Sequence, residues 1–398
     1  MPAARTTVIA VLFLIGAAAC ALAQDLPELA FEKYTLDNGL EVILHRDDTI
    51  PMVSVNVWYH VGSKNEKPGR TGFAHLFEHM MFQGSLNHDS DYFLPLQKIG
   101  GQVNGSTNKD RTNYWENVPS DQLELALFLE ADRMGNLLPA MTQEKLDNQR
   151  DVVKNEKRQS ENRPYAKSRQ ILLEMMYPEG HPYRWTVIGS MDDLSAASKE
   201  DVGEFFELYY APNNASLCVA GDFDPDQAKD WIARYFGPIE PGRPVDRLSD
   251  WIPVLEGTRR AVAEDAVELP RLYMQWHSPG WYKAGDAEFD LLASILSSGK
   301  NSRLYKSLVY EQQIAQDVNT YQDSREISSI FNLQVTAKPG VSIEELEKAV
   351  DAELRKLLDK GIKKDELERA RTSWEAGFMR RMQLVGGFGG KADQLNAY

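Results

Sequence analysis

The stretch His75-Leu76-Phe77-Glu78-His79 carries the strongest chemical signal in this chain of 398 residues. On a helix, with about 100° between successive residues, His79 lies about 40° from His75, and Glu78 lies about 60° to the other side. The three side chains therefore share one face of a helix. Two imidazoles one turn apart can bind one zinc ion, and a carboxylate beside them can take a proton from water.

A pair of solvated histidines on a surface helix is the alternative interpretation of this stretch. The flanking residues argue against it, since they are apolar on both sides: Phe73, Leu76, Phe77, Met80, Met81 and Phe82. A helix of this composition is largely buried, and buried ionisable side chains need partners. The sequence therefore favours a metal site over a surface pair.

A catalytic zinc also needs a third protein ligand and one open position. The helix expected over residues 142–162 offers Gln149 and Glu156 on one face, seven residues apart. Taken alone, a glutamate among lysines and arginines is usually a solvated ion-pair partner. Spacing along the chain does not bring Glu156 to the histidines, so on the residues alone its role stays open.

The first half of the chain alternates between strand and helix signals. Asp37-Asn38-Gly39 predicts a hairpin turn. Alternation from Val53 to Val61 predicts a half-buried strand. The remaining expected elements are a strand on each side of that turn (31–36, 40–45), a helix over 71–82, a strand pair (101–107, 112–118), helices over 120–135 and 142–162, and a strand over 217–221.

A segment rich in proline and glycine, residues 238–253, is interpreted as a linker. Beyond it we expect strands over 259–264, 271–277, 317–321 and 330–337 and helices over 288–296 and 365–382. Ser342 and Glu345 predict a capping box that opens another helix, which ends before Gly361. Strands and helices mix in both halves, so the fold class is α+β, with a mixed α/β sandwich in each half.

Composition and charge narrow the partners. The net charge is −15, which disfavours nucleic acid and anionic membranes and favours cationic peptides or a divalent metal. Residues 1–23 resemble a secretory signal, with Arg5, an apolar core and Ala21-Leu22-Ala23 before the cleavage point. A membrane anchor is the alternative, but the apolar run is shorter than the ~20 residues of a span. We therefore expect an exported, periplasmic or secreted protein without stable membrane insertion.

Two other side chains with reactive chemistry are interpreted as structural. Cys218, the one cysteine beyond the leader, lies in the apolar run Leu217-Cys218-Val219-Ala220, which is typical of a buried, inert thiol. His181, in Gly180-His181-Pro182-Tyr183, has no ligand spacing and is interpreted as a packing residue.

The zinc motif, followed by Glu156 after 76 intervening residues, resembles the inverted motif of the pitrilysin/insulinase family of metallopeptidases. Further stretches carry the same likeness, which covers residues 30–398: Leu36-Asp37-Asn38-Gly39-Leu40, Gly72-Phe73-Ala74, Asn104-Gly105-Ser106-Thr107, Thr112-Asn113-Tyr114, Ala211-Pro212-Asn213-Asn214-Ala215, Val219-Ala220-Gly221-Asp222 and Ser302-Arg303-Leu304.

This resemblance implies roles for single residues. His75, His79 and Glu156 would hold one zinc ion per chain, and Glu78 would be the general base. Asn104 and Gly105 would lie on an edge strand that pairs with substrate backbone. The family commonly has a second carboxylate where this chain has Gln149, so an amide would support the metal site here.

The resemblance also implies the architecture and the activity. Two similar sandwich domains with antiparallel-rich sheets would form half of a clamshell. We expect a catalytic domain over 24–237 and a truncated, non-catalytic homologous domain over 254–398. A position near residue 195 is the alternative for the boundary between the two domains. The family's substrate-holding Arg and Tyr positions match Val309 and Gln316, and the chain ends without a helix cap. We therefore expect a homologous second half or partner subunit.

The function expected is zinc-dependent endoproteolysis of peptides or unfolded proteins. Two alternatives belong to other classes. One is a non-catalytic partner subunit of the same fold, which would typically lack the full motif. The other is a zinc hydrolase of non-peptide substrates, which would have no use for a strand that pairs with an extended peptide.

Overall fold

The computed structural model describes residues 29–397, so the expected signal sequence, residues 1–23, lies outside the described part. Within residues 29–397, none of the helices combines the length and the apolar character that a membrane span requires. The elements described below all belong to the compact unit that begins at Glu32.

The first sheet has six strands in the order β1-β2-β6-β3-β5-β4. Only β2 and β6 run parallel, and every other neighbouring pair is antiparallel. The strands are β1 (Glu32–Thr35), β2 (Glu41–Arg46), β3 (Met52–Tyr59), β4 (Gln102–Thr107), β5 (Thr112–Pro119) and β6 (Ala215–Gly221). The predicted hairpin is confirmed, since β1 pairs with β2 across a turn in which Gly39 has a φ of +89°, a conformation that glycine adopts without strain.

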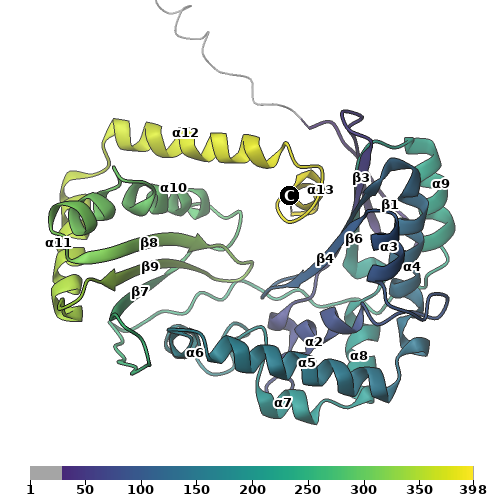
Figure 1. Ribbon diagram of the computed structural model, residues 1–398, viewed down its shortest axis with the longest axis horizontal. Helices are drawn as coiled ribbons and strands as arrows, with labels where there is room; N and C mark the ends of the chain where they lie inside the picture. The colour runs from purple at the N-terminus through teal and green to yellow at the C-terminus, as the bar shows by residue number, and fades with distance from the viewer. Residues whose placement is uncertain (1–28, 398) are drawn as a thin grey trace, which may run out of the picture. The chain divides into compact units, whose positions relative to one another are not determined.

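Helices pack on one face of this sheet (Figure 1). They are α2 (Phe73–Met80), α3 (Phe93–Lys98), α4 (Leu123–Ala140), α5 (Gln143–Glu161), α7 (Met191–Ala196), α8 (Lys199–Tyr209) and α9 (Pro225–Phe236). The helix α6 (Lys167–Met176) instead contacts β7 (Arg271–Ser278) of the second sheet. The expected helices over 71–82, 120–135 and 142–162 are confirmed as α2, α4 and α5. The helices α3 and α6 to α9 were not predicted from the sequence, although α9 buries Ala228, Ile232 and Phe236 at helical spacing.

The strand β3 differs from its prediction, since it is buried on both faces and not on one. Its apolar side chains face the helices. Its polar face is covered by the short helix α13 (Lys391–Ala397), which comes from the far end of the chain. Trp58 Nε1 donates to Asp393 Oδ1 over 3.1 Å, and Asn396 Nδ2 donates to the Asn56 carbonyl over 2.9 Å. Alternation reports the chemistry of each face and not whether a face is covered.

The second sheet has three antiparallel strands in the order β7-β9-β8. They are β7 (Arg271–Ser278), β8 (Ala315–Asp323) and β9 (Ser329–Ala337). The helical elements of this half are α10 (Asp286–Ser297), the π-helix η4 (Tyr305–Glu311), α11 (Ile343–Lys360) and α12 (Lys364–Arg381). Figure 1 shows α10, α11 and α12 on one side of the sheet, and side chains of η4, α10 and α11 share its apolar core.

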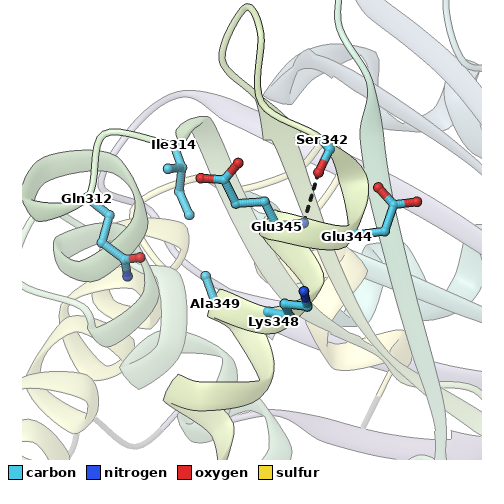
Figure 2. A pocket seen from close by; sticks show the side chains of 7 residues that line it. All are labelled: Gln312, Ile314, Ser342, Glu344, Glu345, Lys348 and Ala349. Carbon is cyan, nitrogen blue, oxygen red and sulfur yellow. Dashed lines mark hydrogen bonds between the residues drawn. The ribbon is translucent and has the colours of Figure 1, made fainter.

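The expected start and end of α11 are confirmed. Ser342 Oγ accepts a hydrogen bond from the Glu345 N–H over 3.2 Å, beside a shallow pocket formed by α11 and the end of η4 (Figure 2). The helix ends at Gly361, which has a φ of +68°. Such capping interactions satisfy backbone groups that a helix leaves unpaired at its ends.

Residues 237–270 contain no helix or strand. The expected linker, 238–253, lies within this segment, and its exact bounds stay a prediction. The strand expected over 259–264 is wrong. These residues are mostly exposed, and no described strand pairs with them. Instead the Glu264 carbonyl accepts a hydrogen bond from Lys167 Nζ of α6 over 2.8 Å.

Candidate metal centre

The helix α2 is anchored at its first turn by a buried carboxylate. Glu66 accepts hydrogen bonds from the backbone N–H groups of Gly72 (3.0 Å) and Ala74 (2.9 Å). Trp185 Nε1 donates to the same carboxylate over 2.9 Å. These bonds use N–H groups that a helix start leaves unpaired. Burial raises the pKa of Glu66 to about 8. The role of Glu66 was not predicted from the sequence, in which it is only a glutamate shortly before the expected helix.

The apolar face of α2 orients its polar face. Phe73, Leu76, Phe77 and Met80 are buried in the main core. His75, Glu78 and His79 are only partly buried on the other face. Helix packing alone therefore aims the two imidazoles and the carboxylate away from the core.

The helix α5 brings Glu156 to the histidines. Glu156 Oε2 lies 3.4 Å from His79 Nε2 and 3.7 Å from His75 Nε2. Each of the three residues offers one ligand atom, and these atoms all lie within 4.8 Å of one another. Leu146 and Val153, on the same helix, are buried in the core and set its approach to α2. The residues that the sequence left unconnected are therefore neighbours in space.

This donor set fits a zinc ion. Tetrahedral zinc with bonds of about 2.0–2.1 Å has ligand atoms about 3.3 Å apart, close to the separations between Glu156 and the two imidazoles. Two imidazoles and one carboxylate are a set found in catalytic zinc sites, with a fourth position left open. The side chain of Glu156 is 43% exposed, so the site is accessible to solvent from the side of Glu156.

The surroundings of the two histidines suit metal ligands. Burial and the neighbouring His79 lower the pKa of His75 to about 4, so its imidazole is neutral at pH 7. His79 Nδ1 lies 3.3 Å from the amide oxygen of Gln149. An amide oxygen only accepts hydrogen bonds, so Nδ1 is the donor in this contact, and Nε2 is the nitrogen that faces Glu156.

Gln149 thus lies where the sequence analysis expected it, and it is only 7% exposed. Its Nε2 donates to Asn148 Oδ1 over 2.9 Å, which sets the orientation of the amide. We expect Gln149→Leu to weaken zinc binding by about 10- to 100-fold, because His79 loses the acceptor that orients its ring. Gln149→Glu keeps an acceptor and should retain the affinity or increase it.

Competition with a chromogenic chelator measures these affinities. Gln143→Leu, at the exposed start of the same helix, is the matched control and should bind zinc as the unaltered chain does. An unchanged affinity in Gln149→Leu would show that Gln149 is only a packing residue.

Glu78 bonds to the neighbouring strand β4. Thr107 Oγ1, at the end of β4, donates to Glu78 Oε2 over 2.6 Å. Burial raises the pKa of Glu78, and the hydrogen bond from Thr107 partly offsets that rise. A carboxylate with a raised pKa is suited to take a proton and release it again near neutral pH. Thr107 belonged to a quoted stretch, but the sequence assigned it no role.

Asn104 and Gly105 lie on β4, the edge strand of the first sheet. Asn104 is exposed and Gly105 is buried. A Cβ atom at Gly105 would lie 3.0 Å from the Tyr114 ring and 3.2 Å from the Phe82 ring, so a side chain at this position would crowd both rings. The far edge of β4 pairs with no described strand, and Thr107 connects the same strand to Glu78.

We call His75, His79 and Glu156 the metal group. It opens into a cavity of about 1210 Å³ that is lined by α5, α6, the 185–191 segment and all three strands of the second sheet. Val309 and Gln316 do not line it. Val309 packs on the core of the second half, and Gln316 is exposed. The second half reaches the cavity with other side chains, among them Arg271, Tyr273 and Tyr321.

The structural interpretations of the other candidates hold. Cys218 is fully buried, and burial raises the pKa of its thiol far above the usual range. His181 is buried and stacks on Tyr177, with ring centroids 4.3 Å apart. Its Nε2 lies 2.9 Å from the Trp251 carbonyl.

Comparison with known proteins places these features in a family. Residues 41–184 match the model for insulinase (peptidase family M16), and residues 196–373 match the model for the peptidase M16 inactive domain. The zinc protease PqqE of Helicobacter pylori is 30% identical over 360 residues, which cover 88% of this chain and 80% of that protein.

Solved structures agree with the family assignment. A protease from Helicobacter pylori superposes with a TM-score of 0.84 at 28% identity, covering 90% of this chain and 87% of that one. Pitrilysin superposes with a TM-score of 0.69 at 20% identity, and the match covers 86% of this chain but 38% of pitrilysin. The chain therefore belongs to the M16 family of insulinase- and pitrilysin-type zinc proteases, with an N-terminal M16 domain followed by a domain of the M16 inactive type.

Proposed function

We propose that this protein is a zinc-dependent endopeptidase that cleaves peptides or unfolded proteins. The convergence of His75 Nε2, His79 Nε2 and Glu156 Oε2, with Glu78 on the same helix face, carries the proposal. The three side chains would hold one zinc ion per chain. Zinc bound there would supply Lewis acidity and lower the pKa of a water molecule to about 7.

Glu78 moves the proton in this mechanism. Its Oε2 accepts from Thr107, which leaves Oε1 available to the attacking water. Glu78 takes a proton from that water as its oxygen attacks the scissile carbonyl carbon. It then passes the proton to the amide nitrogen as the carbon–nitrogen bond breaks, so the new carboxylate and amine leave without a covalent intermediate.

The edge strand β4 would hold the substrate. An extended peptide can add to an unpaired edge through main-chain hydrogen bonds. Residues Asn104 and Gly105 would pair with the substrate backbone, while Thr107, on the same strand, bonds Glu78. One strand would thus align the scissile bond and position the base, which is the orientation effect that makes catalysis efficient.

The proposal is tested on the purified full chain. We expect about one zinc per chain by elemental analysis and cleavage of a casein or short-peptide panel that a chelator abolishes and added zinc restores. A chain that binds zinc and cleaves no peptide, alone or with a homologous partner, would favour the non-catalytic alternative.

Export to the periplasm or the exterior is proposed from residues 1–23 alone.

We further propose that the active unit pairs this chain with a homologous second half. The Glu156 side chain is 43% exposed, so bulk water reaches the metal group from one side. Exclusion of water strengthens electrostatic stabilisation, and a lone half is expected to be about 10²-fold or more slower than the paired unit. Light scattering and activity across a dilution series measure this. A monomer with the same specific activity as the assembly would contradict it.

A further inference from the structure

The cavity at the metal centre carries a charge opposite to that of the chain. The whole chain has a net charge of −15. The cavity lining, in contrast, contains six basic side chains and only three acidic ones. The basic side chains are Lys109, Lys157, Arg163, Arg169, Arg271 and Arg325. The preference for cationic peptides that the net charge suggested therefore does not describe this cavity.

Three of the six basic groups already have partners. Lys157 Nζ lies 2.8 Å from Glu161 Oε1, and Arg325 pairs with Asp323. Lys109 donates to main-chain carbonyls, and burial lowers its pKa to about 7. The three acidic side chains of the lining also have partners. Glu161 and Asp323 form ion pairs with Lys157 and Arg325, and Glu156 belongs to the metal group.

Three arginines remain without a carboxylate. The side chains of Arg163 and Arg169 are exposed and make no hydrogen bond or ion pair with any described residue. Arg271 donates through Nε to Thr336 Oγ1 over 2.9 Å, and no described carboxylate lies within ion-pair distance of it. A guanidinium offers five N–H donors in a planar fork that matches a carboxylate.

Arg271 is held in place by a strained residue. Its guanidinium carbon lies 3.7 Å from the centre of the Tyr165 ring. Tyr165 has a φ of +64°, in the left-handed region that residues with side chains rarely adopt. Its hydroxyl donates to the Leu269 carbonyl over 2.8 Å, and its N–H donates to Asp265 over 3.1 Å. Backbone strain persists where surrounding contacts hold it, often at ligand sites.

These observations connect α5 to the arginines. Tyr165 lies in the turn between α5, which carries Glu156, and α6, which carries Arg169. The turn itself carries Arg163. Arg271 begins β7 in the second half. Both halves of the chain therefore direct unpaired positive charge into the cavity that His75 and Glu156 line.

We propose that Arg163, Arg169 and Arg271 select peptide substrates that carry a carboxylate near the scissile bond. The proposal rests on the peptidase function proposed above. The carboxylate can come from an aspartate or glutamate side chain or from a free C-terminus, because a guanidinium binds each with the same geometry.

The test uses quenched-fluorescence peptides of one length in which a single glutamate is moved through the positions on both sides of the cleaved bond. The matched peptides carry glutamine in its place, and each is made with a free and an amidated C-terminus. At 0.15 M salt we expect the best glutamate peptide to have a kcat/KM about 5-fold or more above its glutamine partner. An effect confined to the free C-terminus would identify that source.

Single substitutions then identify the responsible arginines. Arg169→Gln should reduce the glutamate preference by about 2- to 5-fold, and Arg169→Glu should reverse it toward lysine peptides. Arg355→Gln, an exposed arginine of α11 outside the cavity, changes the net charge equally and should leave the preference unaltered. Near-ultraviolet circular dichroism checks that each variant is folded.

Binding to Glu78→Gln separates the two proposals. This variant retains the arginines, so fluorescence anisotropy should show tighter binding of the glutamate peptide even where nothing is cleaved. Equal cleavage and equal binding of glutamate and glutamine peptides would overturn the arginine proposal and leave the peptidase function intact. Absence of cleavage with any peptide, while the binding preference persists, would count against the peptidase function alone.

Discussion

Glu78→Gln is expected to lower kcat/KM for peptide cleavage by about 10²- to 10⁴-fold, the range that general acid–base catalysis supplies. The amide cannot take a proton from water, but it keeps the size of the carboxylate and can accept from Thr107 in the same way. Zinc content should stay at about one per chain, because Glu78 is not among the three residues that form the metal group. Initial rates with a fluorogenic peptide and elemental analysis of the same sample measure both.

The matched control for Glu78→Gln is Glu200→Gln, on the exposed surface of α8. It makes the same chemical change away from the cavity and should leave kcat/KM unaltered. Turnover by Glu78→Gln at the rate of the unaltered chain would rule out Glu78 as the proton carrier.

His79→Ala is expected to reduce zinc from about one per chain to about zero after dialysis and to abolish cleavage. The change removes one of three ligand atoms, and two remaining ligands hold zinc much more weakly. His79 also takes part in the contact with Gln149, so the orientation of the site is lost with the ligand. Elemental analysis measures zinc, and circular dichroism checks that the fold persists.

A surface histidine provides the comparison. His88 lies outside the metal group, and its Nε2 contacts only Ser90 Oγ, at 3.1 Å, among the described residues. His88→Ala should therefore keep full zinc and activity. Stoichiometric zinc in folded His79→Ala would refute the ligand assignment.

Local patterns predicted the parts of this protein that depend on local geometry. His75, Glu78 and His79 lie on one face of α2 because an α-helix places residues i, i+3 and i+4 together. The turn at Gly39 and the cap at Ser342 follow from backbone preferences of single residues. Such signals need no information from the rest of the chain.

Local patterns did not predict the contacts between segments that are distant in the sequence. Glu66 is an ordinary glutamate in the sequence, and only the fold places it at the first turn of α2. Thr107 bonds Glu78 because β4 lies beside α2. The C-terminal helix α13 covers β3, although β3 has the alternation of a strand with one exposed face.

The sequence by itself determined that His75, Glu78 and His79 share one helix face, and it determined the mixed α/β class. Through its resemblance to a family it also pointed to Glu156. Only the tertiary structure brought Glu156 within 3.7 Å of both imidazoles. It also placed three arginines that lack a carboxylate partner in the lining of the same cavity. The physical reason is that helical spacing acts over one turn, whereas α2 and α5 meet only when their apolar faces are buried. The net charge of a chain is likewise a sum, and the charge at a site depends on which groups folding leaves unpaired.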